Sequence, residues 1–233
     1  MAQITDELSC YGKLLVEKGL TTGPGGNISA REGDAVFLSP SGFSLAEIKP
    51  QDWVVVNLKN GKRIGKDNGL RPTCEISMHL GCYLARKDVK TVIHTHPILA
   101  TALATAGIQF KGLFPDFVAL IGPEAPVLDY IVPGGEELRE AVVRELRKGH
   151  NAVLLKNHGA VTVGENMKEA YYRSLLLEDS ARFLMTMLSV GKKPRYLSPS
   201  EVIGIENMEA EDYRKLLLKG SPSLKLRQPK EKK

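Results

Sequence analysis

The stretch Thr91-Val92-Ile93-His94-Thr95-His96-Pro97 indicates a buried strand and the end of the fold at which chemistry takes place. Alternate side chains of a strand lie on one face of its sheet, so His94 and His96 are expected to point the same way. Pro97 suits the first turn of a helix, which predicts a strand over residues 90–95 and a helix over residues 98–106. Two imidazoles on one face, at the end of a strand, can bind one divalent ion.

A third histidine, His158, also follows a strand. It stands between Asn157 and Gly159, just after a predicted strand over residues 152–156 that contains the apolar run Val153-Leu154-Leu155. Three neutral imidazoles with one open position form the pattern of a catalytic zinc site, which suits zinc and the later divalent transition metals better than magnesium or calcium. Separate, hydrogen-bonded histidines are the simpler interpretation of any one of these residues. Three of them in similar settings favour a metal centre.

Glu75 is the candidate acid or base of this site. It begins a predicted helix over residues 75–86, behind Pro72, where free backbone N–H groups favour an anion. An ordinary first-turn glutamate is the alternative, and the geometry relative to the metal decides between the two. His79 lies one helical turn later on the same face, either as a partner of the site or as a structural residue.

Two short loops contain glycine and small polar residues. Gly25-Gly26-Asn27 and Ser41-Gly42 place backbone N–H groups in turns, where such groups can bind phosphate. Neither loop matches the dinucleotide-binding or the ATP-binding pattern, so turns that need positive φ remain the alternative interpretation.

The rest of the chain alternates irregularly between helix and strand patterns, which predicts an α/β fold with helices on both faces of a mixed or largely antiparallel sheet. No linker interrupts the chain before residue 219, so we expect one domain over residues 1–218. Further helices are expected at residues 3–19, 136–148, 166–188, 200–205 and 210–218. Further strands are expected at residues 28–31, 35–38, 53–58, 117–121, 127–131 and 160–163.

The composition is that of a globular protein: 42% of the 233 residues are hydrophobic and 25% are charged. The net charge of +5 comes from residues 219–233, which predicts a basic, disordered tail and no basic face for nucleic acid. The charged residues of this tail are Lys219, Lys225, Arg227, Lys230, Lys232 and Lys233 against Glu231.

No apolar run reaches the ~18 residues of a membrane span, and residues 1–7 lack the pattern of a secretory signal. The three cysteines Cys10, Cys74 and Cys82 show no paired spacing. We therefore expect a protein without disulfides or membrane contact, located in the cytoplasm.

Five motifs, in this order and spacing, resemble the class II aldolase/adducin family. They are Gly26-Asn27-Ile28-Ser29-Ala30-Arg31, Ser39-Pro40-Ser41-Gly42, Pro72-Thr73-Cys74-Glu75, Val92-Ile93-His94-Thr95-His96-Pro97 and Leu155-Lys156-Asn157-His158-Gly159. The resemblance covers about residues 5–218, and the long helix with Glu169, Ala170 and Glu178 is similar to the family's as well. It implies an α/β/α sandwich around a central, mainly antiparallel sheet, and a homotetramer with active sites at subunit interfaces.

The resemblance implies that His94, His96 and His158 bind Zn²⁺, with Co²⁺, Mn²⁺ or Fe²⁺ as other candidates. It makes Glu75 the acid/base, and a fourth ligand when substrate is absent. The positions that match the family's phosphate site are Gly26, Asn27, Ser41, Gly42 and Thr73, followed by Cys74.

Two departures from the aldolase pattern affect the expected substrate. Thr73-Cys74 stands where aldolases of the family have a serine pair, and a thiol is a poor hydrogen-bond donor. Asp116 stands near the position at which aldolases of the L-fuculose-1-phosphate type have a catalytic tyrosine, and an aspartate in this region resembles the epimerase branch. Tyr213 is the candidate phenol that a neighbouring subunit would supply.

The expected function is that of an aldehyde-lyase of carbohydrate metabolism, a zinc-dependent aldolase. It would cleave a ketose phosphate of the L-fuculose-1-phosphate type to dihydroxyacetone phosphate and an aldehyde through an enediolate. A sugar-phosphate 4-epimerase, a decarboxylase or a dehydratase could use the same metal site. A non-catalytic adducin-like interaction module is disfavoured, since all three histidines and Glu75 are present. A cupin would have an all-β pattern, and the helix predicted after Pro97 argues against it. Two of the histidines with Glu75 could also form a non-haem iron site, so the identity of the metal stays open.

Overall fold

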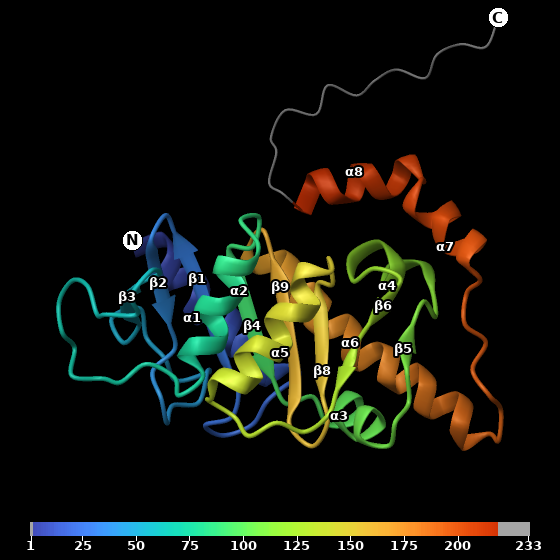
Figure 1. The fold of residues 1–233 in the computed structure, drawn as a ribbon, viewed down its shortest axis with the longest axis horizontal. Coiled ribbons are helices and arrows are strands. Elements are labelled where there is room, and N and C mark those ends of the chain that lie inside the picture. The colour runs from blue at the N-terminus through green and yellow to red at the C-terminus, as the bar shows by residue number, and fades with distance from the viewer. Residues whose placement is uncertain (1, 219–233) are drawn as a thin grey trace, which may run out of the picture.

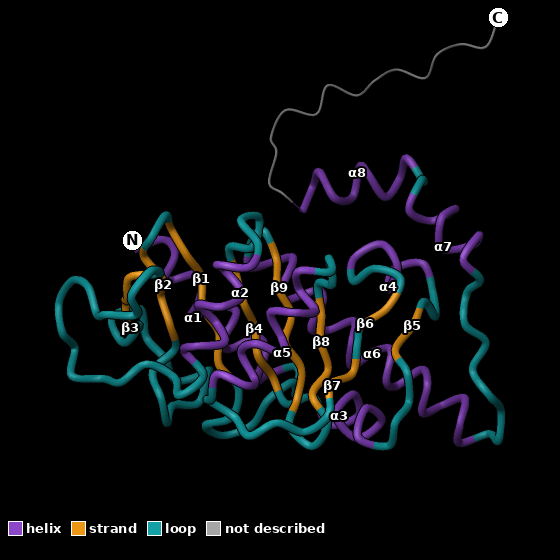
Figure 2. Tube along the Cα trace, in the orientation of Figure 1, coloured by secondary structure: helices purple, strands orange, loops and turns teal. Residues whose placement is uncertain are grey.

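The computed structural model describes residues 2–218, which form three layers: a central sheet and a layer of helices on each of its faces (Figure 1, Figure 2). The seven-stranded sheet has the order β3-β2-β1-β4-β9-β8-β7, and β7 pairs parallel with β8 while the other neighbours pair antiparallel. Its strands are β1 (Asn27–Glu32), β2 (Ala35–Leu38), β3 (Val54–Asn57), β4 (Thr91–Thr95), β7 (Val127–Leu128), β8 (Ala152–Leu155) and β9 (Gly159–Gly164). The predicted α/β fold with a mainly antiparallel sheet is confirmed.

Helices cover both faces of this sheet. In Figure 1, α2 (Ile76–Ala85) and α5 (Glu136–Arg147) lie in front of it, while α1 (Ala2–Glu17), α3 (Ile98–Thr105) and α6 (Met167–Ser189) lie behind it. Two short helices, α7 (Pro199–Glu206) and α8 (Glu209–Leu218), form an arm that turns back toward α4 (Pro115–Leu120).

The strand that carries the H-x-H pair lies in the middle of the sheet. All five residues of β4 are buried, because helices cover both of its faces. Val92 packs into the core under α2 and α5, and its neighbour Ile93 packs into the core under α1 and α6. The antiparallel register places Asn27 of β1 opposite His94. The first glycine loop therefore reaches the sheet next to the first histidine.

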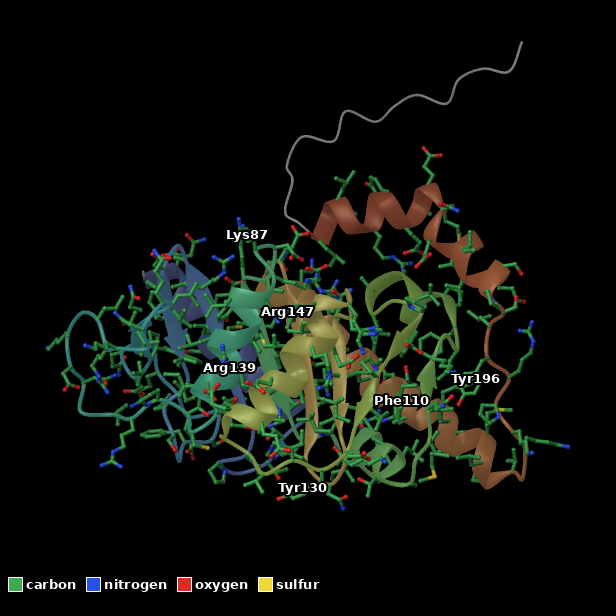
Figure 3. All side chains as sticks on the ribbon, in the orientation of Figure 1. Lys87, Phe110, Tyr130, Arg139, Arg147 and Tyr196 are labelled. Carbon is green, nitrogen blue, oxygen red and sulfur yellow. The ribbon has the colours of Figure 1, made fainter. Side chains whose placement is uncertain are left out.

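The amphipathic sequence of α5 explains why this helix packs against the front face of the sheet. Leu138, Val142 and Leu146 recur on one face and are buried against the sheet. Arg139 and Arg147 lie on the outward side of the helix (Figure 3).

The two ends of the sheet are chemically different. At one end, β4 finishes with His94 and Thr95, His96 follows directly, and α3 begins; we call this the histidine end. The opposite end is marked by Lys87, just before β4, and Figure 3 shows Lys87 and Tyr130 at opposite sides of the molecule. Among the described residues, no helix is long and apolar enough to cross a membrane.

Residues 117–121, expected as a strand, form α4 instead. Pro115 occupies the first turn of this helix with Asp116 beside it, and both residues suit a helix N-terminus. A short apolar run such as Phe117–Ile121 does not distinguish a strand from a buried helix, so the prediction was wrong at this point.

The region around α4 differs from the prediction in two further ways. The strand expected at residues 127–131 is confined to Val127–Leu128. A second, two-stranded sheet of β5 (Phe110–Lys111) and β6 (Glu124–Ala125) was not predicted. Two-residue strands are too short to show a periodic pattern.

The remaining predicted elements agree with the structure to within a few residues. The single domain proposed for residues 1–218 stays a prediction. The basic tail at residues 219–233 lies outside the described residues.

Candidate metal centre and acid–base site

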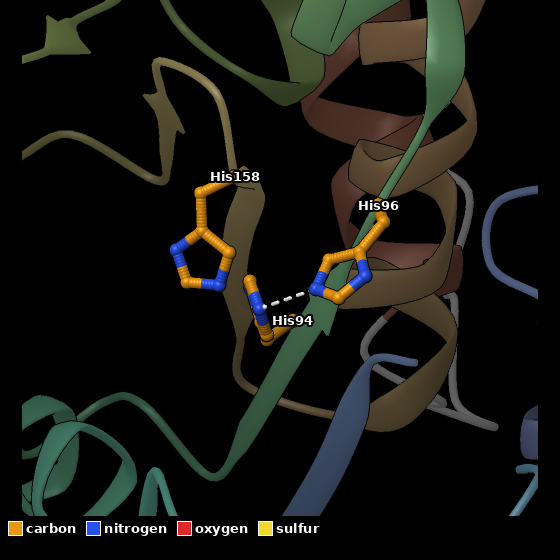
Figure 4. Close-up of side chains that lie close together, drawn as sticks. All are labelled: His94, His96 and His158. Atoms are coloured by element: carbon orange, nitrogen blue, oxygen red, sulfur yellow. Dashed lines mark hydrogen bonds between the residues drawn. The ribbon is translucent and has the colours of Figure 1, made fainter. Parts of the chain in front are cut away.

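The three histidines singled out in the sequence converge at the histidine end of the sheet (Figure 4). His94 and His96 come from the end of β4, and His158 comes from the turn between β8 and β9. One ligand atom from each imidazole lies within 4.8 Å of the other two. The two Nε2 atoms of His94 and His96 are 3.0 Å apart. The structure therefore confirms that the three side chains form one cluster.

The turn before β9 brings His158 to this cluster. Asn157 adopts a left-handed conformation with φ 55°, and it is the one non-glycine residue with positive φ among the described residues. Gly159 then passes so close to β4 that a Cβ there would lie 2.2 Å from the Thr95 carbonyl oxygen. The same Cβ would lie 2.8 Å from Cδ2 of His96. Only a glycine permits this approach, which brings His158 beside the other two histidines.

The protonation of the cluster suits metal binding. Nδ1 of His94 lies 3.0 Å from the Ala160 carbonyl oxygen, and a carbonyl only accepts, so Nδ1 carries the proton and Nε2 is free. Burial lowers the pKa of His94 well below its usual value, and the neighbouring imidazoles lower it further. Burial also lowers the pKa of His96 and of His158. All three side chains are therefore neutral near pH 7, which is the form that ligates metals.

Glu75 completes the cluster from the N-terminus of α2. Its side chain is buried, with Oε2 3.2 Å from Nε2 of His94 and Oε1 3.6 Å from Nε2 of His158. Oε2 accepts a hydrogen bond of 2.7 Å from Nδ2 of Asn27. Oε1 has no hydrogen-bond partner among the described residues, and neither has Nδ1 of His158.

These observations test whether a metal fits the site. A buried carboxylate oxygen without a partner costs free energy unless another group compensates it. Three neutral imidazoles and a carboxylate are the donor set of zinc and of the later divalent transition metals. The residues present fit such an ion.

The cluster faces an open cavity of about 560 Å³. His96 and His158 form its floor, and Ile98, Thr101 and Thr105 of α3 form one wall. This wall is held by α6, because the Glu178 carboxylate accepts from the backbone N–H groups of Leu99 (3.2 Å) and Ala100 (2.9 Å). Glu178 thus caps a helix whose own N-cap, Pro97, offers no side-chain hydrogen bond.

The first glycine loop packs directly against the histidine strand. Gly26 has φ +72°, and a Cβ there would lie 2.9 Å from the His94 carbonyl oxygen. A Cβ on Gly25 would lie 3.0 Å from Nδ1 of His96. Glycine is therefore needed here for close packing at the site as well as for the turn.

The second loop and the segment before Glu75 lie side by side. The N–H of Ser41 donates to the Arg71 carbonyl (2.9 Å), and the N–H of Thr73 donates to the Ser39 carbonyl (3.0 Å). Gly42 adopts φ +84°. The Thr73 hydroxyl oxygen accepts from the N–H of Glu75 (3.2 Å), and Cys74 is exposed. Thr73 thus contacts Glu75 directly, and the Ser41-Gly42 loop is bonded to the segment that leads to it, while the role of these residues in binding phosphate stays a prediction.

Asp116 and Tyr213 do not join the cluster within one chain. Asp116 pairs with Arg214 of α8 at 2.5 Å, and Tyr213 next to it is exposed. Helix α8 is tied to the opposite end of the sheet, since Nδ2 of Asn166, after β9, donates to the Leu218 carbonyl. A role for either residue in this chemistry needs a second copy of the chain.

Two further residues behind His79 were not predicted as site residues from the sequence. Ser29 of β1 and Tyr83 of α2 lie in one hydrogen-bonded group with His79. The available signal was the spacing: Asn27 and Ser29 alternate on a strand, and Glu75, His79 and Tyr83 recur every four residues on a helix.

Comparison with known proteins gave consistent matches. The model of the "Class II Aldolase and Adducin N-terminal domain" matches residues 6–185. A 5-deoxy-D-ribulose 1-phosphate aldolase of Bacillus thuringiensis serovar kurstaki is 34% identical over 84% of this chain and 91% of its own. A 3-oxo-tetronate 4-phosphate decarboxylase of Haemophilus influenzae is 30% identical over 84% of this chain and 92% of its own. A solved structure of L-fuculose 1-phosphate aldolase superposes with a TM-score of 0.81 at 29% identity, covering 92% of this chain and 97% of that one.

Proposed function

The chain belongs to the class II aldolase and adducin family, as a lyase, and on that premise we propose that it is a metal-dependent aldolase. It would cleave a ketose 1-phosphate into dihydroxyacetone phosphate and an aldehyde. The aldolase relatives act, by their names, on 1-phosphates of five- and six-carbon sugars, which supports this substrate class.

One observation carries the proposal: a buried carboxylate stands beside three converging imidazoles and keeps one oxygen free. The Glu75 side chain contacts His94 and His158, and its Oε1 has no hydrogen-bond partner among the described residues. His94, His96 and His158 would hold a divalent ion, which would supply Lewis-acid chemistry to the substrate's carbonyl and hydroxyl oxygens.

Glu75 moves the proton in this reaction. Asn27 holds Oε2 by a hydrogen bond of 2.7 Å, so Oε1 is the oxygen left to accept or return a proton. In the cleavage, Oε1 of Glu75 accepts the proton of the substrate's C4 hydroxyl while the C3–C4 bond breaks and the aldehyde leaves. The Glu75 carboxyl then returns this proton to C3, the carbon next to the carbonyl, which the cleavage leaves as a carbanion equivalent. A buried carboxyl beside the reacting atom contributes about 10²–10⁴-fold to such a step.

The loops around Glu75 are the proposed phosphate site. The hydroxyl oxygen of Thr73 accepts from the N–H of Glu75, so its O–H is free to donate to a phosphate oxygen. The backbone N–H of Ser41 already donates to the Arg71 carbonyl, which leaves side chains and the turns at Gly26 and Gly42 for the anion. The exposed Cys74 thiol is a weak donor and adds little to this contact.

The proposed assembly is a homotetramer whose active sites lie between subunits. Asp116 and Tyr213 lie at the opposite end of the sheet from the cluster, so they reach an active site only across an interface. Complementation tests this arrangement. Inactive Glu75→Gln and Tyr213→Phe chains, unfolded and refolded together, should recover activity in about a quarter of the sites if the two residues come from different subunits. Mixtures without any recovery would contradict the shared site.

The decisive test is proton exchange. Dihydroxyacetone phosphate is incubated with the protein in deuterated water and followed by NMR, with and without a chelator. We expect exchange that the chelator abolishes and that added Zn²⁺ restores. The Glu75→Gln variant should bind Zn²⁺ and lose the exchange, because an amide cannot act as the base.

The outcome separates the proposal from its alternatives. A metal-loaded wild type that exchanges no proton of dihydroxyacetone phosphate is not an aldolase with this donor. The decarboxylase among the relatives makes decarboxylation of a phosphorylated sugar acid the next activity to test, followed by 4-epimerisation. Cytoplasmic location is the compartment we propose, supported by the free thiols of Cys10, Cys74 and Cys82.

A further inference from the structure

A chain of five polar side chains runs from the reacting carboxylate into the core between β1 and α2. We call Glu75, Asn27, His79, Ser29 and Tyr83 the polar ladder. Its hydrogen bonds are Asn27 Nδ2 to Glu75 Oε2 (2.7 Å), His79 Nε2 to Asn27 Oδ1 (2.6 Å), Ser29 Oγ to His79 Nδ1 (2.6 Å) and Tyr83 Oη to Ser29 Oγ (2.6 Å). All five side chains are buried.

The spacing of strand and helix explains why the ladder forms. Asn27 and Ser29 are two residues apart on β1, which separates them by about 6.6 Å along the strand. His79 and Tyr83 are four residues apart on α2, which separates them by about 6 Å along the helix. Since these rises nearly match, strand and helix side chains alternate in one row without interruption.

The direction of every hydrogen bond in the row follows from chemistry. An ionised carboxylate only accepts, so the Asn27 atom facing Glu75 is the amide nitrogen, and its oxygen faces His79. Nε2 of His79 must then carry the proton. Burial lowers the pKa of His79 to about 3, so the ring is neutral and its Nδ1 carries none. Nδ1 therefore accepts from the Ser29 hydroxyl, and Ser29 Oγ accepts from Tyr83.

The far end of the row is held in the donating state. Burial raises the pKa of Tyr83 far above its usual value, so its phenol keeps its proton. Each interior member of the ladder both donates and accepts within the row, and a network of this kind has one arrangement of protons. Reversing the Asn27 amide would set its oxygen against the Glu75 carboxylate and its NH₂ against the N–H of His79.

We propose that His79 is a positioning residue of the active site: its Nε2–H fixes the Asn27 amide, which holds Oε2 of Glu75 and leaves Oε1 free toward the histidine cluster. Ser29 and Tyr83 fix the His79 tautomer that makes this possible. The inference rests on the proposed function, because Glu75 is the group that moves the proton. His79 contacts neither the cavity nor the three clustered histidines through a hydrogen bond that the structure shows.

Two substitutions at His79 separate positioning from simple packing. His79→Leu removes the donor, and we expect kcat for proton exchange to fall about 100-fold, the order expected when a reacting group is misplaced by ~1 Å. His79→Gln keeps an N–H for Asn27, and it should recover to within about tenfold of the wild type. Both variants should bind one Zn²⁺ per chain as the wild type does, with KM changed less than about threefold.

The matched pair Ser29→Ala and Ser174→Ala controls for the loss of a buried hydroxyl. Ser174 of α6 makes a hydrogen bond of the same length, 2.6 Å, to Thr162, outside the site. Ser29→Ala should lower kcat about tenfold, because His79 can then adopt either tautomer. Ser174→Ala should lower stability and leave kcat unchanged.

A measurement without substrate tests the ladder independently of the reaction. Long-range ¹H–¹⁵N NMR of histidine-labelled wild type identifies the His79 signals by their loss in His79→Gln, and it should show Nε2 protonated and Nδ1 bare. A protonated Nδ1, a His79→Leu variant with wild-type kcat, or a His79→Gln variant as inactive as His79→Leu would overturn the proposal. A wild type with the expected tautomer but no exchange would instead refute the proposed function and leave the ladder standing.

Discussion

The close approach of Gly159, the first residue of β9, to the end of the neighbouring strand β4 predicts a large effect of a single methyl group. Gly159→Ala places a Cβ 2.2 Å from the Thr95 carbonyl oxygen and 2.8 Å from Cδ2 of His96. Ordinary contacts begin at 3.4 Å, so the first distance is 1.2 Å too short. The obstructing atom belongs to the backbone of a fully buried strand, so no rotamer change can relieve the clash.

Two quantities should change. Overpacking of this kind costs about 1–3 kcal/mol, which lowers the melting temperature of a chain of this size by roughly 2–12 °C. The strands must separate by about 1 Å, whereas metal–ligand distances tolerate about 0.2 Å. We therefore expect Zn²⁺ affinity to fall by about 10–100-fold, the range seen when the support of a ligand is removed.

Thermal unfolding in chelator and Zn²⁺ titration measure these effects separately. Gly204→Ala is the matched control. Gly204 lies on α7, does not have a positive φ, and has no atom within 4 Å of the added Cβ. Alanine there should be neutral or stabilise by up to about 1 kcal/mol. A Gly159→Ala variant with the melting temperature and Zn²⁺ affinity of the wild type would refute the packing argument.

Three further outcomes are expected. Glu178→Gln should lower the free energy of unfolding by about 1–2 kcal/mol in urea denaturation, because the carboxylate caps α3; an unchanged midpoint would contradict this. Burial lowers the pKa of His79 from 6.5 to about 3, so below pH 6.5 only the unfolded chain takes up this proton, and stability falls with acidification. This residue's share of the change in unfolding free energy approaches about 1.4 kcal/mol per pH unit, and it should be missing in His79→Gln. Urea denaturation of both proteins from pH 6 to 4.5 measures this change, and equal slopes would exclude a lowered pKa of His79. Thr73→Val keeps the shape of the side chain but removes its O–H, so KM for dihydroxyacetone phosphate should rise about tenfold, and an unchanged KM would exclude a phosphate contact.

The sequence could predict the histidine cluster because its signal is local. His94 and His96 alternate on a strand that ends at Pro97, and His158 follows a second apolar strand. Both strands end at the same side of the sheet, since the turn between antiparallel β8 and β9 lies beside the end of β4. Helix periodicity likewise predicted α5 and α6 to within a residue or two.

The part that could not be predicted depends on tertiary contacts. The apolar run at Phe117–Ile121 fits a strand as well as a helix, and its packing against α6 and α7 decides for the helix. The role of Glu178 depends on α3, which lies some 80 residues earlier in the chain, and no local pattern reveals that pairing. In the proposed assembly, Asp116 and Tyr213 would meet an active site only across a subunit interface, and a contact of that kind leaves no local pattern in the chain.

The histidine cluster joins parts of the chain that unfolding separates. His96 and His158 are more than sixty residues apart in sequence, so the unfolded chain does not present them together. An ion that binds only the folded form adds about 1.4 kcal/mol to stability for each tenfold rise in its free concentration above Kd. For a chain of this size, each such step raises the melting temperature by roughly 3–6 °C. Heat resistance would therefore report the metal supply around the protein, and a melting series in metal buffers would measure affinity before any substrate is known.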